Sequence, residues 1–273
     1  FFHHFPSLSL ALYDVSLMGS APYAADTLLK AKEVALGIDL TTIFSERIRI
    51  DEIYFIDADI FIQVDEKGTA NYNIYAADTT QSTAGTDSSG TALKIEKIQI
   101  ENSNLVYDDL SIPILITAEG LNYTGKGDLS KAVFDLSSSI EVKAFDFDYD
   151  FAPYIKRKKL TANLITKINT NSLAFEFTKN DLLINTLPVD FTGKFEFLEK
   201  GYNMNFELQS TKGNLHDVFS ALPPEYMGWV DSTEASGKTE MRAYLKGKYI
   251  ASENIMPDLG FNMNIRDGYI NNK

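Results

Sequence analysis

The stretch Ala144–Phe151 reads AFDFDYDF, an unbroken alternation of apolar and acidic side chains. Successive side chains of a β-strand point to opposite faces of the sheet, so one face of this strand would be aromatic and the other acidic. A helix would scatter the same residues around its circumference. We therefore predict a half-buried strand whose apolar row is Phe145, Phe147, Tyr149 and Phe151.

The same alternation recurs in four later segments, and it predicts further strands with one apolar face each. Turn-forming residues separate the predicted strands at short intervals, as in Gly125–Asp128 and Glu199–Tyr202. Short intervals favour antiparallel neighbours that are joined by hairpins. The predicted apolar positions are Leu173, Phe175, Phe177, Phe191, Phe195, Phe197, Met204, Phe206, Leu208, Phe261, Met263 and Ile265.

Helix signals are scarce and gather between residues 214 and 230. Asn214 is a preferred N-cap for a helix over Leu215–Leu222, which the following Pro-Pro pair would end. A second short turn, reaching Val230, would carry Trp229, the only tryptophan of the chain. The predicted fold class is mostly β, with one or two short helices.

Residues 76–90 contain only Ala, Asp, Thr, Gln, Ser and Gly, without one large apolar side chain. Such a tract cannot bury enough surface to offset its ordering entropy, so we expect a flexible linker or loop. A weak internal repeat flanks it, because Arg49–Ile60 aligns with Lys94–Leu105 in its basic, apolar, acidic and small positions. We predict one unit used twice, with a kink at Asp57–Ala58 or Asn102–Ser103 between two strands.

Composition excludes several classes of protein. The 38 acidic residues outnumber the 25 basic ones and give a net charge of −13, which argues against a nucleic-acid partner. The absence of cysteine removes disulfides, thiolate metal sites and cysteine nucleophiles. No apolar run approaches the length of a membrane span. Because residue 1 is Phe and the last residues lie inside a predicted strand, we expect a fragment of a longer chain.

Candidate chemistry is sparse. The adjacent His3 and His4 would point to opposite faces of a strand, so we expect no metal site and no cofactor. The aspartates at 146, 148 and 150 fit a solvated strand face better than a calcium loop. The basic run Lys156–Lys159 leaves two readings open, a solvated turn with a strand start, or contact with an anionic headgroup or acidic partner. Neither a serine elbow nor a phosphate-binding glycine loop is present, which predicts that the chain is not an enzyme.

The apolar strand faces are the remaining candidate site, and they also allow two readings. Two sheets could bury each other's apolar faces in a sandwich. Alternatively, one curled sheet could leave its inner face open as a surface for a ligand or a membrane. Alternation alone cannot separate these arrangements, because both require one apolar face for each strand.

The stretch Asp65–Tyr72 contains, in order, an acidic residue, Gly, a small residue, Asn and an aromatic. It follows a series of short apolar segments whose characteristic positions are Phe5–Leu8, Asp14, Val15, Leu17, Pro22, Ala25–Leu29, Leu40, Ile48, Ile50 and Ile53. In these positions the first part of the chain resembles the AsmA family of envelope proteins of Gram-negative bacteria, most closely at Asp65–Tyr72.

The resemblance implies the architecture of bridge-like lipid transfer proteins, an elongated, curled antiparallel sheet that forms a taco-like β-groove. It implies an N-terminal β unit at 1–75, a linker at 76–92, and a continuing β-groove at 93–273 with a helical insert near 214–230. Phospholipid acyl chains would be the partner in the groove. The expected lining is Phe145, Phe147, Tyr149, Phe151, Leu173, Phe175, Phe177, Phe195, Phe197, Met204, Phe206, Leu208, Phe261 and Met263.

The resemblance also implies a place and a role. We expect a periplasmic protein, anchored to the inner membrane by a transmembrane helix absent from this chain and able to meet other envelope proteins. It would support phospholipid transfer to the outer membrane, or assembly of that membrane. The alternative is a structural β scaffold or interaction protein of the envelope that carries no lipid.

Overall fold

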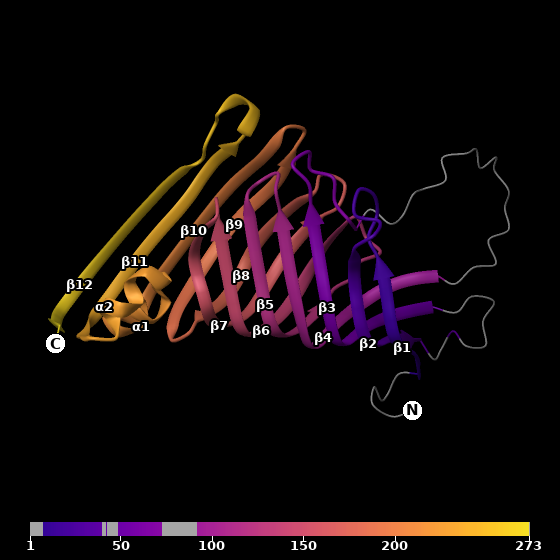
Figure 1. Ribbon diagram of the computed structural model, residues 1–273, viewed down its shortest axis with the longest axis horizontal. Coiled ribbons are helices and arrows are strands. Elements are labelled where there is room, and N and C mark those ends of the chain that lie inside the picture. Colours follow the sequence, from indigo (N-terminus) through magenta and orange to yellow (C-terminus); the bar gives the residue numbers. More distant parts are fainter. Residues whose placement is uncertain (1–7, 40–41, 43–48, 73–91, 273) are drawn as a thin grey trace. The chain divides into compact units, whose positions relative to one another are not determined.

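The computed structural model describes residues 8–39, 42, 49–72 and 92–272 (Figure 1). Twelve strands form one sheet in which the strand order follows the sequence. The strands are β1 (Leu8–Met18), β2 (Thr27–Ile38), β3 (Arg49–Val64), β4 (Ala92–Asp109), β5 (Ile114–Lys126), β6 (Val133–Tyr149), β7 (Ala152–Asn169), β8 (Ala174–Ile184), β9 (Leu187–Leu198), β10 (Gly201–Asn214), β11 (Thr233–Tyr249) and β12 (Asp258–Asn272). The predicted class, mostly β in a mostly antiparallel sheet, is confirmed.

The pairing of β3 with β4 corrects the expectation of hairpin-linked antiparallel neighbours, because these two strands run parallel. Parallel neighbours need a long crossover connection, and residues 65–91 supply it. The predicted linker at 76–92 falls almost entirely within 73–91, outside the described residues, and it stays a prediction.

Two short helices interrupt the strands between β10 and β11, as predicted. Helix α1 (Leu215–Ala221) begins after Asn214, whose side chain accepts a hydrogen bond from the Asp217 amide. The Asp217 carboxylate accepts in return from the Asn214 amide, which completes a capping box. The 3₁₀ turn Pro224–Tyr226 and helix α2 (Met227–Val230) follow, and a further 3₁₀ turn lies at Ala251–Glu253.

The sheet divides into two compact units. Unit 1 takes the chain up to residue 123 together with 147–152, and unit 2 takes 124–146 and the chain from 153 onward. Each unit is described separately below.

In unit 1, the strands bend at residues with positive φ. These lie inside the strands, at Asp14 in β1, Asp57 in β3, Asn102 in β4 and Gly120 in β5. At Asp14, Asp57 and Asn102 the strand pairing skips a position without a shift of register, so each residue bends its strand without forming a β-bulge. The predicted kinks at Asp57–Ala58 and Asn102–Ser103 are therefore confirmed.

The internal repeat has a direct structural meaning. Beyond a register shift near Ile50, β3 and β4 pair residues that are 45 positions apart, such as Ile53 with Ile98 and Asp59 with Asn104. The two copies thus lie side by side in the register of the sequence alignment. Asn102 donates from Nδ2 to Asp57 Oδ1 at 2.7 Å, and the Ala58 amide donates to Ser103 Oγ at 2.9 Å.

Small residues form the core of unit 1 at the bend. Ala31, Val34 and Ala58 are buried, and larger aliphatic and aromatic side chains pack against them from both arms of the strands: Val15, Leu29, Phe55 and Ile60. Small side chains at a bend let neighbouring strand arms approach, so the small buried residues at this place follow from the kink.

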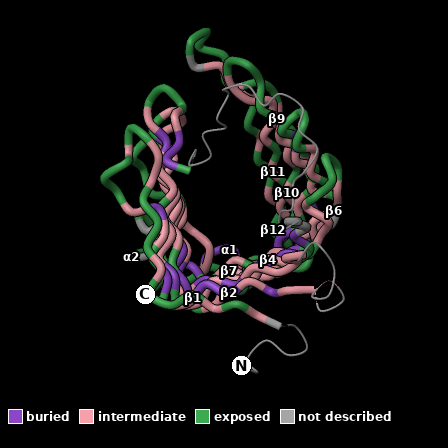
Figure 2. Tube along the Cα trace, turned by 90° about the vertical axis from the view of Figure 1, so that its right-hand side faces the viewer, coloured by how far each residue is buried: buried purple, intermediate pink, exposed green. Residues whose placement is uncertain are grey.

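In Figure 2 buried positions are confined to short stretches, and β9, β10 and β11 are mostly intermediate or exposed.

Candidate apolar binding face

Strand register gathers most of the predicted site residues of unit 2 on one face of the sheet. Phe175 of β8 pairs with Phe195 of β9, which pairs with Met204 of β10. Directly paired residues of antiparallel strands project from the same face, so each row of pairs is a row of neighbouring side chains. Five rows cross the strands: Phe197, Tyr202 and Tyr249; Phe175, Phe195 and Met204; Phe177, Phe206, Leu245 and Leu259; Phe191, Leu208, Ala243 and Phe261; Met241 and Met263. We call this the unit 2 apolar face.

Aromatic rings contact one another across this face. The ring centroid of Phe177 lies 5.3 Å from that of Phe191 and 5.9 Å from that of Phe206. Phe206 also lies over Gly193, where an added Cβ would come within 2.4 Å of its ring. Gly193 therefore has a packing role, since any side chain there would displace the ring.

The opposite face of the same strands is polar and charged. Lys194 Nζ lies 2.6 Å from Glu196 Oε1 on β9, and Arg266 Nη2 lies 3.1 Å from Glu240 Oε1 across β12 and β11. The sheet is thus amphipathic across its thickness, with charges in water on one side and Phe, Met and Leu on the other.

Helix α1 covers one end of the apolar face. Val218 packs with Leu187 and Val189 in a buried cluster, against which further apolar residues of the sheet pack: Leu182, Ile184, Leu208, Met241 and Met263. The end of α1 is fixed because its Ser220 carbonyl accepts from Lys158 Nζ at 2.7 Å and from Asn185 Nδ2 at 2.8 Å. Burial lowers the pKa of Lys158.

The rest of the face is not closed. All twelve described strands belong to one sheet, so no second sheet of the described part of unit 2 covers these residues. Phe197 is 44% exposed, Phe261 62% and Leu259 76%. Exposed apolar side chains in contiguous rows mark a contact surface for a ligand, a membrane or another protein. The arrangement corresponds to the single-sheet reading of the sequence and not to a sandwich within this unit.

Two predicted lining residues lie elsewhere. Leu173 precedes β8 in the turn after β7, with φ of 47°, and Phe151 lies in the turn between β6 and β7, with φ of 60°. Phe151 is 87% exposed. Alternation continues past the strand ends in the sequence, but the chain has already turned there, so neither residue belongs to the rows of the unit 2 apolar face.

In the segment Ala144–Phe151, burial does not separate an apolar face of the strand from an acidic face. Phe145, Phe147 and Tyr149 lie in β6 as predicted, but every residue from 145 to 149 is half-buried. Phe145 belongs to unit 2, whereas Phe147 and Tyr149 belong to unit 1. The structure therefore does not join these three to the unit 2 apolar face.

Sequence reasoning missed six residues of this face: Tyr202, Met241, Ala243, Leu245, Tyr249 and Leu259. The Tyr202 ring stacks 5.3 Å from Phe195 and 6.5 Å from Tyr249. Period two extends from Met204 back to Tyr202, so that residue had a signal. Leu245 is identified by its pairing with Phe206 and Leu259 by its pairing with Leu245, and both pairings depend on non-local register.

The prediction of a solvated acidic face holds at Asp150, which is exposed, but not at Asp146 and Asp148, which are half-buried. Asp146 forms an ion pair with Lys156 at 2.9 Å and accepts a hydrogen bond from the Arg157 amide. The Oδ1 atom of Asp148 is buried. Lys158 is buried against α1, and Lys159 Nζ lies 3.8 Å from Glu141. All four positions of the basic run therefore make contacts within the protein.

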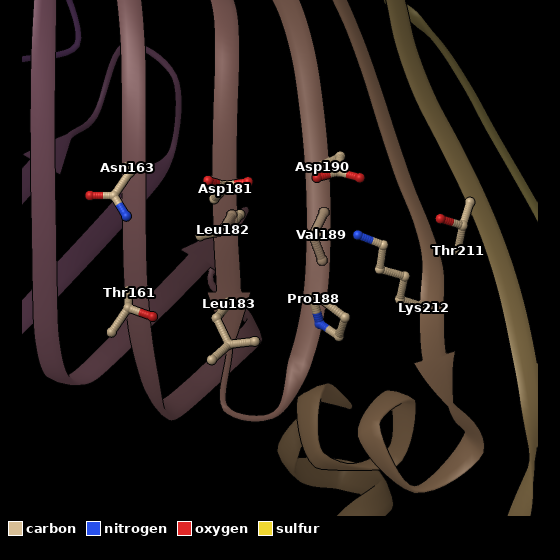
Figure 3. A pocket seen from close by; sticks show the side chains of 10 residues that line it. All are labelled: Thr161, Asn163, Asp181, Leu182, Leu183, Pro188, Val189, Asp190, Thr211 and Lys212. Carbon is tan, nitrogen blue, oxygen red and sulfur yellow. The ribbon is translucent and has the colours of Figure 1, made fainter.

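A polar depression lies on the face of unit 2 opposite to the apolar one (Figure 3). Asn163, Asp181 and Asp190 stand side by side on β7, β8 and β9, and Lys212 extends toward them from β10. The depression holds about 240 Å³ and its charged side chains are exposed. No group of three His, Asp or Glu that could hold a metal occurs among the described residues. His3 and His4 lie outside them.

No family model, curated protein or solved structure matches this chain. Within the described ranges, no helix is long and apolar enough to cross a membrane.

Proposed function

We propose that the unit 2 apolar face binds acyl chains of phospholipids, and that the protein thereby supports phospholipid transfer to, or assembly of, the outer membrane. The observation that carries the proposal is the exposed part of the face, in which rows of Phe, Met and Leu run across five neighbouring strands without a covering layer among the described residues of unit 2. Resemblance to the AsmA family supports the envelope setting, periplasmic and anchored to the inner membrane.

The physical basis is transfer of hydrocarbon from water to an apolar surface. Each buried methylene contributes about 0.8 kcal/mol, so a tail that crosses several strands gains several kcal/mol without any specific bond. The opposite face keeps its charges in water, so one sheet can separate the two environments. Phe and Met side chains adapt to a flexible chain, which favours binding without a unique pose.

Helix α1 divides the face into a covered end and an open part. Around Val218, apolar residues already have protein neighbours and gain little from a lipid. The open part, from Phe175 and Phe197 across to Phe261, is where a tail would be bound. The proposal therefore assigns acyl chains to the open part only.

Native mass spectrometry with lipid extraction, on protein purified from a Gram-negative host, tests the proposal. We expect co-purifying phospholipid, and its loss in a Phe197→Asp, Phe261→Asp double variant. Both side chains are already substantially exposed, so the fold should tolerate these changes better than changes at buried positions.

A matched control adds the same charge to the other face. Thr192 lies on β9 and is exposed on the polar side, so a Thr192→Asp variant should retain its lipid. Thermal unfolding of all variants shows whether the sheet is intact. A folded wild-type protein without lipid would favour the structural scaffold, with the apolar face covered by protein.

A further inference from the structure

The helical insert holds Trp229 in a fixed position. Its ring lies 5.2 Å from that of Phe219 in an edge-on arrangement, and Phe219 is buried in α1. The Trp229 carbonyl accepts hydrogen bonds from the hydroxyls of Ser232, at 3.0 Å, and Thr233, at 2.6 Å. The ring therefore has a rigid support, and ordering it for a partner costs little entropy.

Part of the same ring faces solvent together with a second aromatic side chain. Trp229 is 44% exposed and Tyr226 is 48% exposed. They are three positions apart across the 3₁₀ turn and α2, a spacing that places side chains on one side of a helical turn. Trp and Tyr combine an apolar ring with a polar tip, which suits them to the boundary between water and a lipid bilayer.

The charges around this pair indicate which bilayer fits. The segment 214–232 contains Asp217, Glu225 and Asp231 but neither Lys nor Arg. The Tyr226 hydroxyl hydrogen-bonds Glu225, which raises the pKa of Tyr226 and holds that carboxylate beside the aromatic pair. Carboxylates and aromatic faces both attract ammonium groups, whereas they are repelled by a surface of anionic headgroups.

We propose that Tyr226 and Trp229 dock the insert onto the surface of a bilayer of zwitterionic phospholipids, with Glu225 and Asp231 facing the headgroup ammonium groups. The occupant follows from charge complementarity, because the ammonium is the cationic group of such a headgroup. The proposal goes beyond acyl-chain binding and does not require it, since it concerns the insert and not the strand faces.

The single tryptophan makes the test direct. Trp229 is the only fluorescent tryptophan, so its emission reports the position of α2 without any labelling. With vesicles of phosphatidylcholine, we expect a blue shift, and quenching by brominated acyl chains of the same lipid. Replacing part of the phosphatidylcholine by phosphatidylglycerol should weaken binding, and more so at low salt.

Variants separate docking from other contacts. Tyr226→Ala should reduce vesicle binding roughly fivefold, whereas Tyr269→Ala, at a comparably exposed tyrosine on β12, should not change it. The Phe197→Asp, Phe261→Asp double variant should still dock, although it would lose acyl cargo under the proposed function. Unquenched Trp229 emission, tighter binding to anionic vesicles, or equal effects of the two tyrosine changes would overturn the proposal. Vesicle-independent capture of a basic peptide by the same pair would also overturn it.

Discussion

At the scale of single residues, Asn71 explains why the Asp65–Tyr72 stretch folds as one ordered piece. Its side chain is fully buried, with Oδ1 accepting from the Gln63 amide at 3.1 Å and Nδ2 donating to the Phe61 carbonyl at 2.7 Å. Its main-chain carbonyl accepts from the Ser20 amide, which ties the loop after β1 to the loop after β3. One side chain thus satisfies backbone groups that have left the sheet ladder.

We predict that Asn71→Ala is strongly destabilising, by roughly 2–4 kcal/mol, because it leaves one buried donor and one buried acceptor without partners. Urea unfolding measures the change. Asn205→Ala, at an exposed asparagine of β10, should stay within about 0.5 kcal/mol of the wild type. Similar losses in the two variants would show that burial of Asn71 is not what matters.

A second residue-scale prediction concerns Asp51. Its Oδ1 atom is buried without a hydrogen-bond partner, and its pKa is raised by burial and then by repulsion from Glu52, Asp39 and Glu96. A carboxyl whose pKa is raised on folding contributes stability below its unfolded pKa, and that contribution is lost as pH rises through the folded value. The ionised group therefore destabilises the protein at neutral pH.

Asp51→Asn should consequently stabilise the protein at neutral pH, and the gain should shrink as the pH falls below the ordinary range of aspartate. Chemical unfolding at both pH values measures this difference. Asp181→Asn, at an exposed position, removes the same charge and should change the stability at neutral pH by less than Asp51→Asn does. Equal gains from the two substitutions would attribute the effect to net charge alone.

For single residues, the local sequence pattern predicts which residue types belong together but not how far each one is buried. The acidic residue, Gly, Asn and aromatic of residues 65–72 were recognised together, but the burial of Asn71 depends on Ser20, fifty-one positions earlier in the chain. The prediction for Asp146 was wrong because alternation does not reveal which neighbouring strand brings Lys156. Local sequence patterns identify candidate residues, but the burial and the ion pairs of those residues depend on partners that are distant in the sequence.

At the scale of elements, the pairing of β3 with β4 places polar side chains of the two repeat copies in contact. The pKa of Asp57 is lowered, first by the hydrogen bond from Asn102 and then by Lys32, whose Nζ lies 3.5 Å from Asp57 Oδ2. A carboxyl whose pKa is lowered on folding contributes stability above its unfolded pKa, and loses it as pH falls through the folded value.

We predict that Asn102→Gly, which tolerates the positive φ at this bend, destabilises the protein at neutral pH and has less effect in acid. Unfolding measured across the acidic range follows the difference. Adding Asp57→Asn to the variant should then remove most of the remaining pH dependence of the pair. An effect of Asn102→Gly that is independent of pH would place the cost in backbone flexibility instead.

The cap of α1 gives a second prediction at this scale. Asn214→Ala removes the acceptor for the Asp217 amide and should cost about 1 kcal/mol. Hydrogen exchange should rise in Leu215–Ala221 before it rises in the strands. His216→Ala, at an exposed position of the same helix, should change neither quantity. Unchanged exchange in α1 would mean that its packing and the contacts to Ser220 suffice without the cap.

The elements themselves were largely predictable from the sequence. The strands follow from period two, and the insert follows from Asn214 and the Pro-Pro pair. The parallel pairing of β3 and β4 was not, because the turn signal at Asp65–Gly68 indicates a reversal of the chain and does not show which strand the chain will pair with beyond it. The 45-residue repeat was the better guide, since copies of one unit can pair in equivalent register.

At the scale of the whole molecule, each strand needs one apolar face in a sandwich and in a single open sheet alike. The sequence therefore could not distinguish them. The distinction in unit 2 comes from strand pairing, which aligns apolar residues of β8 to β12 into rows and places them on one sheet. An acidic chain with a net charge of −13 can keep such a face dispersed in water by mutual repulsion.

The last prediction follows from linkage between binding and folding. A ligand that binds only the folded protein stabilises it by about 2.7 kcal/mol at a concentration one hundred times its Kd. For a chain of this size, that corresponds to a rise in Tm of roughly 5–10 °C. We expect this rise when delipidated protein is heated with a short-chain phosphatidylcholine below its micelle-forming concentration.

The size of the effect depends on the open part of the unit 2 apolar face. The Phe197→Asp, Phe261→Asp double variant should lose most of the rise in Tm, while Thr192→Asp should keep it, because the charge then lies on the polar face. Soluble phosphocholine without acyl chains should have no effect on either protein, since the proposed contact is with the tail. A rise that is equal in all three proteins would place lipid outside this face, and no rise would leave the face to a protein partner.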